Sequence, residues 1–251
     1  MSNLRFAAAK ERRAALITGG ARGIGRACAL RIAEEGRDIA IVDLLEAPGR
    51  EVVQEVEALG QQALFVQTDV ADEEAMRAAV ALTVERFGRL DILVCCAGIL
   101  GLEAPFFEQS AAQFDKVMRI NLYGVYHAHQ AAIPHMLERG WGRCATMTSS
   151  ARRGSPNQVP YCVSKAAVYT LIHSLGNAYP KEGVFVNGVE PGRALTDMII
   201  PRFSAEFLAN PGTPIGRYAD PEEVAEVVEF LCSERNTYTT GSVWSSKGAS
   251  G

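Results

Sequence analysis

The chain has 251 residues, of which 48% are hydrophobic and 22% are charged, and its formal net charge at pH 7 is −4. This composition is typical of a globular protein and excludes collagen-like, low-complexity and wholly disordered chains. A slightly acidic chain has no basic field for binding nucleic acid, so we expect no nucleic-acid partner. No apolar run is long enough to span a bilayer, so we expect no membrane partner either.

The N-terminal segment has basic side chains but lacks the apolar core of a signal peptide. We therefore predict a flexible N-terminus over residues 1–13. The six cysteines fall within expected strands and helices and form no CxxC pair, which favours reduced thiols and a cytoplasmic location. The four histidines have no carboxylate partner at metal-ligand spacing, so we expect no metal site.

Short apolar, β-branched runs alternate with amphipathic segments along the chain. The predicted strands cover residues 14–18, 38–43, 63–66, 91–95, 143–147, 184–189 and 241–244. The predicted helices cover residues 24–35, 49–59, 72–87, 112–139, 160–179 and 221–233. Continuously apolar strands that alternate with helices indicate an α/β fold, in which helices cover both faces of a doubly wound parallel sheet.

No linker or change of composition divides the chain, so we predict a single domain over residues 14–251. The stretch 198–218 breaks the strand–helix alternation and contains three prolines. Long irregular segments in compact domains are usually lids or binding loops. We therefore predict a substrate loop at about residues 193–218.

A glycine-rich turn, TGGARGIG at residues 18–25, follows the first predicted strand and precedes a helix. Glycines there permit a tight turn and a close approach of the backbone to a pyrophosphate, which the free N–H groups of the helix N-terminus would bind. A plain strand-to-helix turn is the alternative. Asp43 ends the next strand, where an acidic side chain accepts the ribose hydroxyls of NAD. Asp43 makes NAD the favoured cofactor, and NADP is less favoured although Arg22 would suit its extra phosphate.

Tyr161 and Lys165 lie four residues apart and therefore on one face of a predicted helix. Thr148, Ser149 and Ser150 stand upstream, at the end of a predicted strand. In isolation, such a Tyr–Lys pair is usually part of a solvated helix surface. A phenol beside an ammonium can also serve as a general acid or base.

Several further pieces accompany these two motifs in order along the chain: Asp69-Val70, CAG at 96–98, Asn121, the two serines at 149–150, PGRALT at 191–196 and PIGRYADPEEVA at 214–225. Together they make the chain similar to the short-chain dehydrogenase/reductase family over essentially its whole length. The resemblance implies a Rossmann-type sheet and hydride transfer between a nicotinamide and a small-molecule substrate.

The resemblance also implies roles for single residues. Tyr161 would exchange a proton with the substrate oxygen, Lys165 would lower the pKa of Tyr161 and bind the nicotinamide ribose, Ser149 would orient the substrate oxygen, and Asn121 would hold a water in a proton relay. The implied cofactor-binding residues are Gly19, Arg22, Gly23, Ile24, Gly25, Asp43, Asp69, Val70, Gly98, Tyr161, Lys165, Pro191, Gly192 and Thr196.

The chain departs from the family pattern at several positions. Cys95-Cys96 stands where two asparagines are usual, and Lys247-Gly248-Ala249 stands where Asp-Gly-Gly is common. The family's usual spacing between the catalytic serine and tyrosine, counted back from Tyr161, leads to Thr148. Counting forward from the preceding strand leads to Ser149 instead. We expect Ser149 to be the catalytic hydroxyl, with Thr148 or Ser150 as the alternative.

Three arginines stand near the expected substrate cleft: Arg152, Arg153 and Arg193. The guanidinium group suits a carboxylate or a phosphate, so at least one of the three could bind an anionic end of a substrate. In the alternative interpretation, Arg152 and Arg153 point to solvent or contact another subunit.

The leading hypothesis is an NAD-dependent oxidoreductase that interconverts a secondary alcohol and a ketone, with a small polyol, sugar or related hydroxy compound as substrate. A 3-oxoacyl thioester reductase is the alternative on the same scaffold. An inactive dinucleotide-binding protein is the alternative from a different class. By the family resemblance, the long helices at 112–139 and 160–179 would pair with other subunits in a homotetramer or a homodimer.

Overall fold

The computed structural model describes residues 12–196, 200, 206, 210 and 212–249. Its centre is a parallel sheet of seven strands in the order β3-β2-β1-β4-β5-β6-β7. The strands are β1 Ala14–Thr18, β2 Asp38–Asp43, β3 Ala63–Gln67, β4 Ile92–Cys95, β5 Gly142–Met147, β6 Val184–Pro191 and β7 Val243–Ser246. The fold class predicted from the sequence is confirmed.

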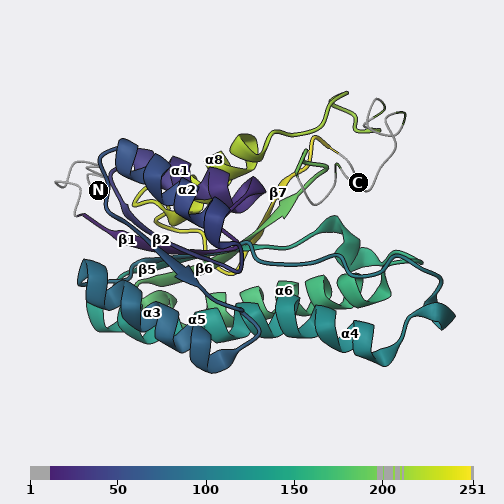
Figure 1. Cartoon of the computed structure of the whole chain (residues 1–251), viewed down its shortest axis with the longest axis horizontal. Coiled ribbons are helices and arrows are strands. Elements are labelled where there is room, and N and C mark those ends of the chain that lie inside the picture. Colours follow the sequence, from purple (N-terminus) through teal and green to yellow (C-terminus); the bar gives the residue numbers. More distant parts are fainter. Residues whose placement is uncertain (1–11, 197–199, 201–205, 207–209, 211, 250–251) are drawn as a thin grey trace.

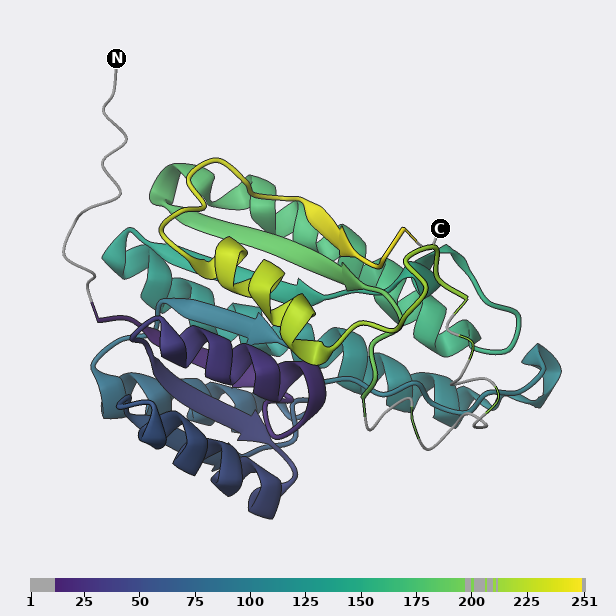
Figure 2. The same ribbon diagram turned by 90° about the horizontal axis from the view of Figure 1, so that it is seen from above.

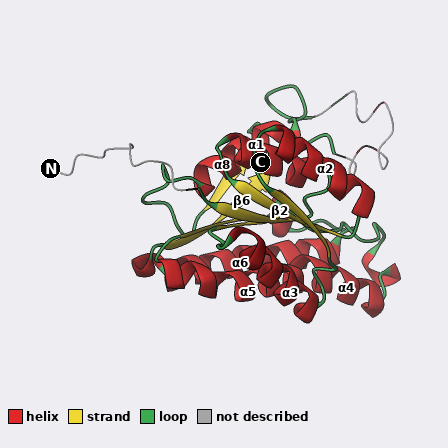
Figure 3. Ribbon diagram, turned by 60° about the vertical axis from the view of Figure 1, so that its left-hand side comes forward, coloured by secondary structure: helices red, strands yellow, loops and turns green. Residues whose placement is uncertain are grey.

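Helices cover both faces of the sheet (Figures 1 and 3). One face carries α1 Gly23–Glu34, α2 Glu46–Ala58 and α8 Pro221–Cys232, which Figure 2 shows from above. The other carries α3 Glu73–Phe87, α4 Ala111–Met118, α5 Gly124–Arg139 and α6 Val159–Ala178. Short helical turns complete the structure: η1 Phe106–Glu108, η2 Arg119–Tyr123, η3 Ser150–Arg153 and η4 Pro180–Glu182.

The two apolar cores explain why the strands are continuously hydrophobic. All five residues of β1 are buried. Ile17 belongs to the core with Ile32 of α1, whereas its neighbour Leu16 belongs to the other core with Met76 of α3 and Ile172 of α6. Because successive side chains of a strand point to opposite faces, a strand covered on both faces needs apolar residues at every position.

Most predicted boundaries differ from the observed ones by one or two residues, and three differences have a clear structural basis. The helix predicted over 112–139 is divided by η2, a π-helical turn that contains the buried Asn121. Helix α2 starts three residues before the predicted position, because Pro48 is tolerated in a first turn and Gly49 leaves room for the ring of Phe65. Strand β7 lies two residues later than predicted, after a turn at Gly241, whose φ is +63°.

The sheet order places the turn after β1 beside the turn after β4, because β1 pairs with both β2 and β4. The chain leaves these two neighbouring strands toward opposite sides of the sheet. In open α/β sheets this divergence creates a crevice at the carboxyl ends of the strands, where ligands bind.

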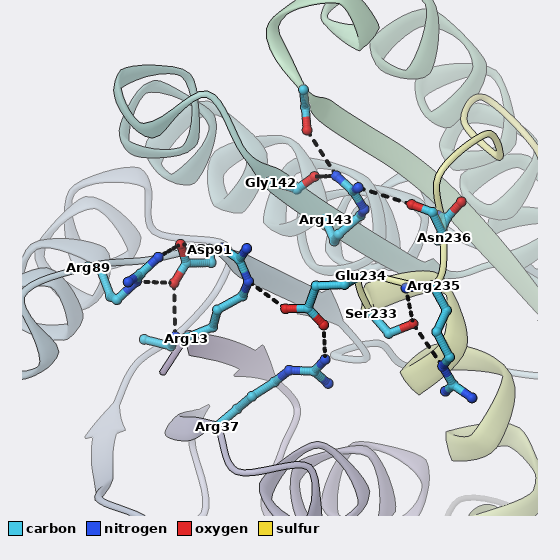
Figure 4. Close-up of polar contacts among 12 residues, drawn as sticks. Arg13, Arg37, Arg89, Asp91, Gly142, Arg143, Ser233, Glu234, Arg235 and Asn236 are labelled. Atoms are coloured by element: carbon cyan, nitrogen blue, oxygen red, sulfur yellow. Dashed lines mark hydrogen bonds and ion pairs between the residues drawn. The ribbon is translucent and has the colours of Figure 1, made fainter. Parts of the chain in front are cut away.

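A network of buried ion pairs joins the amino ends of the strands, at the opposite edge of the sheet (Figure 4). Asp91, before β4, accepts hydrogen bonds from both Arg89 and the Ala14 N–H. Arg13 lies 3.5 Å from Asp91 and 2.7 Å from Glu234, which also pairs with Arg37 at 2.9 Å. The network links the start of β1 to the segment after α8.

The N-terminal prediction needs a correction at its last two residues. Residues 1–11 lie outside the described residues, but Arg12 pairs with Asp38 at 2.7 Å and Arg13 is 8% exposed. The guanidinium of Arg13 also lies 3.4 Å from the centre of the Trp141 ring. Arg12 and Arg13 are therefore anchored to the sheet, because buried acids across the strand ends attract them.

The helices that the structure describes include none that is long and apolar enough to cross a membrane. Part of the predicted substrate loop, at 197–199, 201–205, 207–209 and 211, lies outside the described residues.

Replacing Asp91 with Asn should destabilise the fold strongly. The substitution removes the charge that neutralises Arg89 and helps to neutralise Arg13, and both guanidinium groups are largely buried. Removing one partner of a buried ion pair costs about 3–5 kcal/mol. Urea unfolding should show a loss of this size, whereas Glu46→Gln, in an exposed pair with Arg50, should cost less than about 1 kcal/mol. Equal effects of the two substitutions would contradict this view of the network.

Candidate active site

A cavity of about 330 Å³ opens at the carboxyl ends of β1, β2, β4, β5 and β6. It runs from the glycine-rich turn after β1 to the Tyr–Lys pair on α6. Its walls are formed by Gly19, Arg22, Gly23, Ile24, Gly25, Val42, Asp43, Leu44, Leu45, Thr68, Asp69, Val70, Cys96, Ala97, Gly98, Ile99, Ile120, Met147, Thr148, Tyr161, Lys165, Pro191 and Thr196. Most of the residues singled out in the sequence therefore lie around one cavity.

The glycine-rich turn is packed so closely that side chains would not fit. A Cβ at Gly25 would lie 2.0 Å from the Gly19 carbonyl oxygen, and one at Gly19 would lie 2.6 Å from the Ala97 nitrogen. Gly19 also has a φ of +67°, which favours glycine. The turn thus brings the N-terminus of α1 close to the cavity.

Helix α1 begins at Gly23, and its N-cap residue Arg22 makes no side-chain capping bond to the first turn. The first N–H groups of a helix carry partial positive charge and bind anions. Gly23, Ile24 and Gly25 line the cavity at this point. The tight glycine turn and this first helical turn fit the pyrophosphate of a dinucleotide.

Asp43 is held rigidly at the end of β2. One carboxylate oxygen accepts a hydrogen bond from the Ala21 N–H and the other from the Leu45 N–H, both at 3.1 Å. Each oxygen keeps a further lone pair for a hydroxyl donor. The exposed Arg22 lines the same end of the cavity.

Gly192 is the one predicted cofactor residue that is not part of the cavity wall. Its N–H donates to the Ser246 carbonyl at 2.8 Å, and a Cβ there would lie 2.6 Å from the Cα of Lys247. Gly192 therefore faces the C-terminal segment. Thr196, by contrast, approaches the start of α1, because its Cγ2 would lie 3.5 Å from a Cβ at Gly23.

Lys165 is buried, and its Nζ donates to the Met147 carbonyl oxygen at 2.8 Å. Burial lowers the pKa of Lys165 to about 8, against a smaller opposing effect of Cys96 and Cys95. No carboxylate contributes to this balance. The ammonium is thus poised to lose its proton near neutral pH more readily than an ordinary lysine.

The pKa of Tyr161 differs from the expectation. Burial raises it, and a hydrogen bond with Ser149 opposes this effect only in part. The Nζ of Lys165 lies 5.8 Å from the centre of the Tyr161 ring, and the pKa of Tyr161 nevertheless stays above its ordinary value. Further positive charge near the Tyr161 hydroxyl would lower this pKa.

The hydroxyl that contacts Tyr161 is that of Ser149. The Ser149 Oγ also accepts a hydrogen bond from the Ala151 N–H at 3.2 Å, which fixes its position at the start of η3. Thr148 is occupied elsewhere, because its hydroxyl donates to the Val189 carbonyl at 3.0 Å. Ser149 itself is not part of the cavity wall and reaches the site through Tyr161.

Asn121 lies behind Gly98, and a Cβ at Gly98 would be 3.3 Å from its Oδ1 and 3.8 Å from the Nζ of Lys165. Its amide accepts from the Ile99 N–H at 2.8 Å and donates to the Ile99 carbonyl at 2.9 Å. The amide also donates to the Ser164 hydroxyl at 3.1 Å. The Asn121 side chain therefore joins the turn after β4 to α6, and its role in a water relay stays a prediction.

The three arginines considered for substrate binding have different surroundings. Arg152 forms an ion pair with the buried Glu190 at 2.8 Å, and Arg153 lies 3.7 Å from the same carboxylate. Neither interpretation made from the sequence, a substrate anion or solvent, anticipated this partner. Arg193 is exposed at the start of the predicted substrate loop.

Sequence reasoning missed several residues of the cavity wall, among them Leu44, Leu45, Thr68, Cys96 and Ile120. Leu44 and Leu45 are 57% and 36% exposed, directly after Asp43. Two leucines directly after a carboxylate that is predicted to bind the cofactor could have indicated this part of the cavity wall, because a flat ring of the cofactor needs an apolar surface.

The chain is similar to known proteins over most of its length. A family profile described as Enoyl-(Acyl carrier protein) reductase matches residues 19–248. L-rhamnose 1-dehydrogenase (NAD(P)(+)) from Sphingomonas sp. (strain SKA58) is 36% identical over 238 residues, 92% of this chain and 93% of that protein. Cyclohexanol dehydrogenase from Rhodococcus sp. (strain TK6) is 38% identical over 252 residues, 91% of this chain and 92% of that protein. The structure of an NAD⁺-bound xylitol dehydrogenase superposes with a TM-score of 0.89 at 29% identity, covering 96% of this chain and all of that one.

Replacing Lys165 with Met should stabilise the protein at neutral pH. The folded pKa of about 8 lies below the unfolded value of 10.5, so burial of the charged form costs stability below pH 8. This cost disappears as the pH rises from 8 to 10.5. Urea unfolding of Lys165→Met should show a gain of about 1–3 kcal/mol at pH 7 that vanishes near pH 10.5. The exposed Lys181, replaced in the same way, should show no such gain, and a pH-independent difference at Lys165 would contradict the argument.

Proposed function

The chain belongs to the short-chain dehydrogenase/reductase family, and on that basis we propose that it uses NAD to interconvert a small secondary alcohol and its ketone. As a member, it is an NAD(P)-dependent dehydrogenase that acts on CH–OH groups. The observation that carries the proposal is the single cavity that runs from the glycine-rich turn at one end to Tyr161 and Lys165 at the other.

Tyr161 is the proposed acid–base group. In the oxidation, its oxygen takes the proton of the substrate hydroxyl; in the reduction, its hydroxyl returns that proton to the carbonyl oxygen. When bound, a nicotinamide would supply the hydride acceptor in the oxidation and the hydride donor in the reduction. Ser149, already hydrogen-bonded to Tyr161, orients the substrate oxygen between the two hydroxyls.

Lys165 is proposed to bind the nicotinamide ribose and to support the ionisation of Tyr161. Its ammonium lies at the cavity wall with one hydrogen fixed on the Met147 carbonyl, so two remain for other acceptors. Because burial raises the pKa of Tyr161, the positive charge of an oxidised nicotinamide ring is expected to add to the effect of Lys165 and favour the tyrosinate. Asn121 positions both Ile99, which follows Gly98, and Ser164, next to Lys165 in α6.

The proposed substrates are neutral cyclic or polyhydroxy alcohols. The names of the relatives support this class, since they include a rhamnose, a cyclohexanol and a xylitol dehydrogenase. The geometry supports it too, because the carboxylate of Glu190 already occupies Arg152. The alternative is an anionic substrate end that Arg153 or Arg193 binds, and the assay below tests it as well.

An assay of reduced-cofactor absorbance with L-rhamnose, cyclohexanol, xylitol and 4-hydroxycyclohexanecarboxylate tests the proposal. Tyr161→Phe should lower turnover at least ~10²-fold on the best substrate, because it removes the proton-transfer group but keeps the ring. A fluorescence titration should show that Tyr161→Phe still binds the cofactor. The proposed mechanism fails if Tyr161→Phe keeps near-normal turnover. A preference for the carboxylate over cyclohexanol that Arg153→Ala or Arg193→Ala abolishes would favour the anionic substrate.

Asp43 is proposed to select NAD over NADP. Its carboxylate would accept hydrogen bonds from the ribose hydroxyls and repel a 2′-phosphate. Arg22, which lines the same cavity, would instead attract that phosphate. A charged hydrogen bond contributes about 1.5–3 kcal/mol, so Asp43→Ser should move the ratio of the two specificity constants toward NADP at least about tenfold. Adding Arg22→Ala should reverse much of that change. A native protein that already prefers NADP would refute the proposed choice.

The homotetramer or homodimer expected from the resemblance stays a prediction. Tyr123, the last residue of η2, and Tyr126 of α5 are 52% and 46% exposed, within the helical stretch that the resemblance assigns to subunit contacts. The cytoplasmic location also stays a prediction.

A further inference from the structure

Glu190 is a buried carboxylate that the proposed reaction does not use. It stands in β6 directly before Pro191, which lines the cavity, and its side chain is 0% exposed. One carboxylate oxygen accepts from the Arg152 Nε at 2.8 Å and the other from the Lys247 Nζ at 2.9 Å. Arg153 lies 3.7 Å away. Burial would raise the pKa of Glu190, but Lys247 and Arg152 outweigh it and lower the pKa overall.

Arg152 connects Glu190 to the segment that carries Ser149. It belongs to η3, which begins one residue after Ser149, and its backbone N–H donates to the Ser149 carbonyl at 3.1 Å. Its guanidinium also lies 4.1 Å from the centre of the Tyr169 ring. Tyr169 is on α6, about two turns after Tyr161. Arg152 is therefore held between β6, η3 and α6, which supply Pro191, Ser149 and Tyr161.

Lys247 connects Glu190 to the C-terminal segment. Its Cα would lie 2.6 Å from a Cβ at Gly192, and the preceding Ser246 accepts the Gly192 N–H. The following Gly248 accepts the N–H of Ile215, from the far end of the predicted substrate loop. The Glu190 carboxylate thus joins the serine segment to the C-terminal segment at the cavity.

We propose that Glu190 is a positioning residue, which through Arg152 holds Ser149 against the hydroxyl of Tyr161 and through Lys247 fixes the chain beneath Gly192. This inference rests on the proposed function. The carboxylate reaches neither Ser149 nor Tyr161 in the described contacts, so its effect on the reaction passes through Arg152. A neutral residue at position 190 would remove the charge that pairs with Arg152 and with Lys247, and η3 would lose this attachment to β6.

The substitution Glu190→Gln tests the proposal, because it keeps the shape and removes the charge. On the best substrate of the panel, kcat should fall at least ~10-fold, since small displacements of reacting groups cost large factors in rate. The dissociation constant for NAD should stay within about threefold. Hydrogen exchange in the ligand-free protein should become faster in peptides that cover residues 149–154.

Asp91→Asn is the matched control, a fully buried, arginine-paired carboxylate at the other edge of the sheet (Figure 4). It should lower Tm without changing kcat or the exchange of residues 149–154. If both substitutions lower kcat alike, Glu190 acts through general stability and the proposal is overturned. Glu190→Asp, which keeps the charge, should restore part of kcat, and kcat no higher than that of Glu190→Gln would also overturn it.

A double-mutant cycle separates positioning of Ser149 from any other effect. In a Ser149→Ala background, Glu190→Gln should lower kcat less than about twofold further, because residues that act through one group are not additive. A full additional tenfold loss would overturn the proposal. Its failure is distinguishable from that of the proposed function, which requires Ser149→Ala and Tyr161→Phe to be impaired on their own.

Discussion

The close contact between the glycine-rich turn and the start of the turn after β4 is the constraint on which the site depends. Gly19 approaches the backbone of Ala97 so closely that no side chain fits between them. Because β1 pairs with β4, this contact sits where the chain leaves two neighbouring strands toward opposite faces of the sheet. It places the start of α1 at one end of the cavity and leads through Gly98 to Asn121 and Lys165 at the other.

Burial dominates the electrostatics at the catalytic end. Lys165 is enclosed without a carboxylate partner, and burial raises the pKa of Tyr161 at the same time. Both groups are therefore held toward their neutral forms in the protein alone. A bound positive charge would favour the tyrosinate, because a nearby opposite charge stabilises the ionised form. Ionisation of Tyr161 is then tied to the binding of the oxidised cofactor.

Much of the fold could be predicted from the sequence, because the strands are mostly apolar and alternate with amphipathic helices. The range of β1 and that of β2 agree with the prediction at both ends. The helix predicted over 112–139 is observed as α4, η2 and α5, with helical φ and ψ at both junctions, and only the π-helical turn was not predicted. That turn contains the buried amide of Asn121, whose partners Ile99 and Ser164 are distant in the sequence.

The arginines beside Ser149 show a similar limit of sequence reasoning at the site. Two adjacent arginines after a catalytic serine suggest an anionic ligand only as long as their counter-charge is unknown. That counter-charge stands in β6, 38 residues from Arg152 along the chain, and the parallel pairing of β5 with β6 brings the two together. Glu190 turns one apparent substrate contact into an internal ion pair. Arg152 is thereby removed from the groups expected to reach a substrate, whereas one carboxylate shared with Arg153 and Lys247 leaves positive charge in this part of the protein.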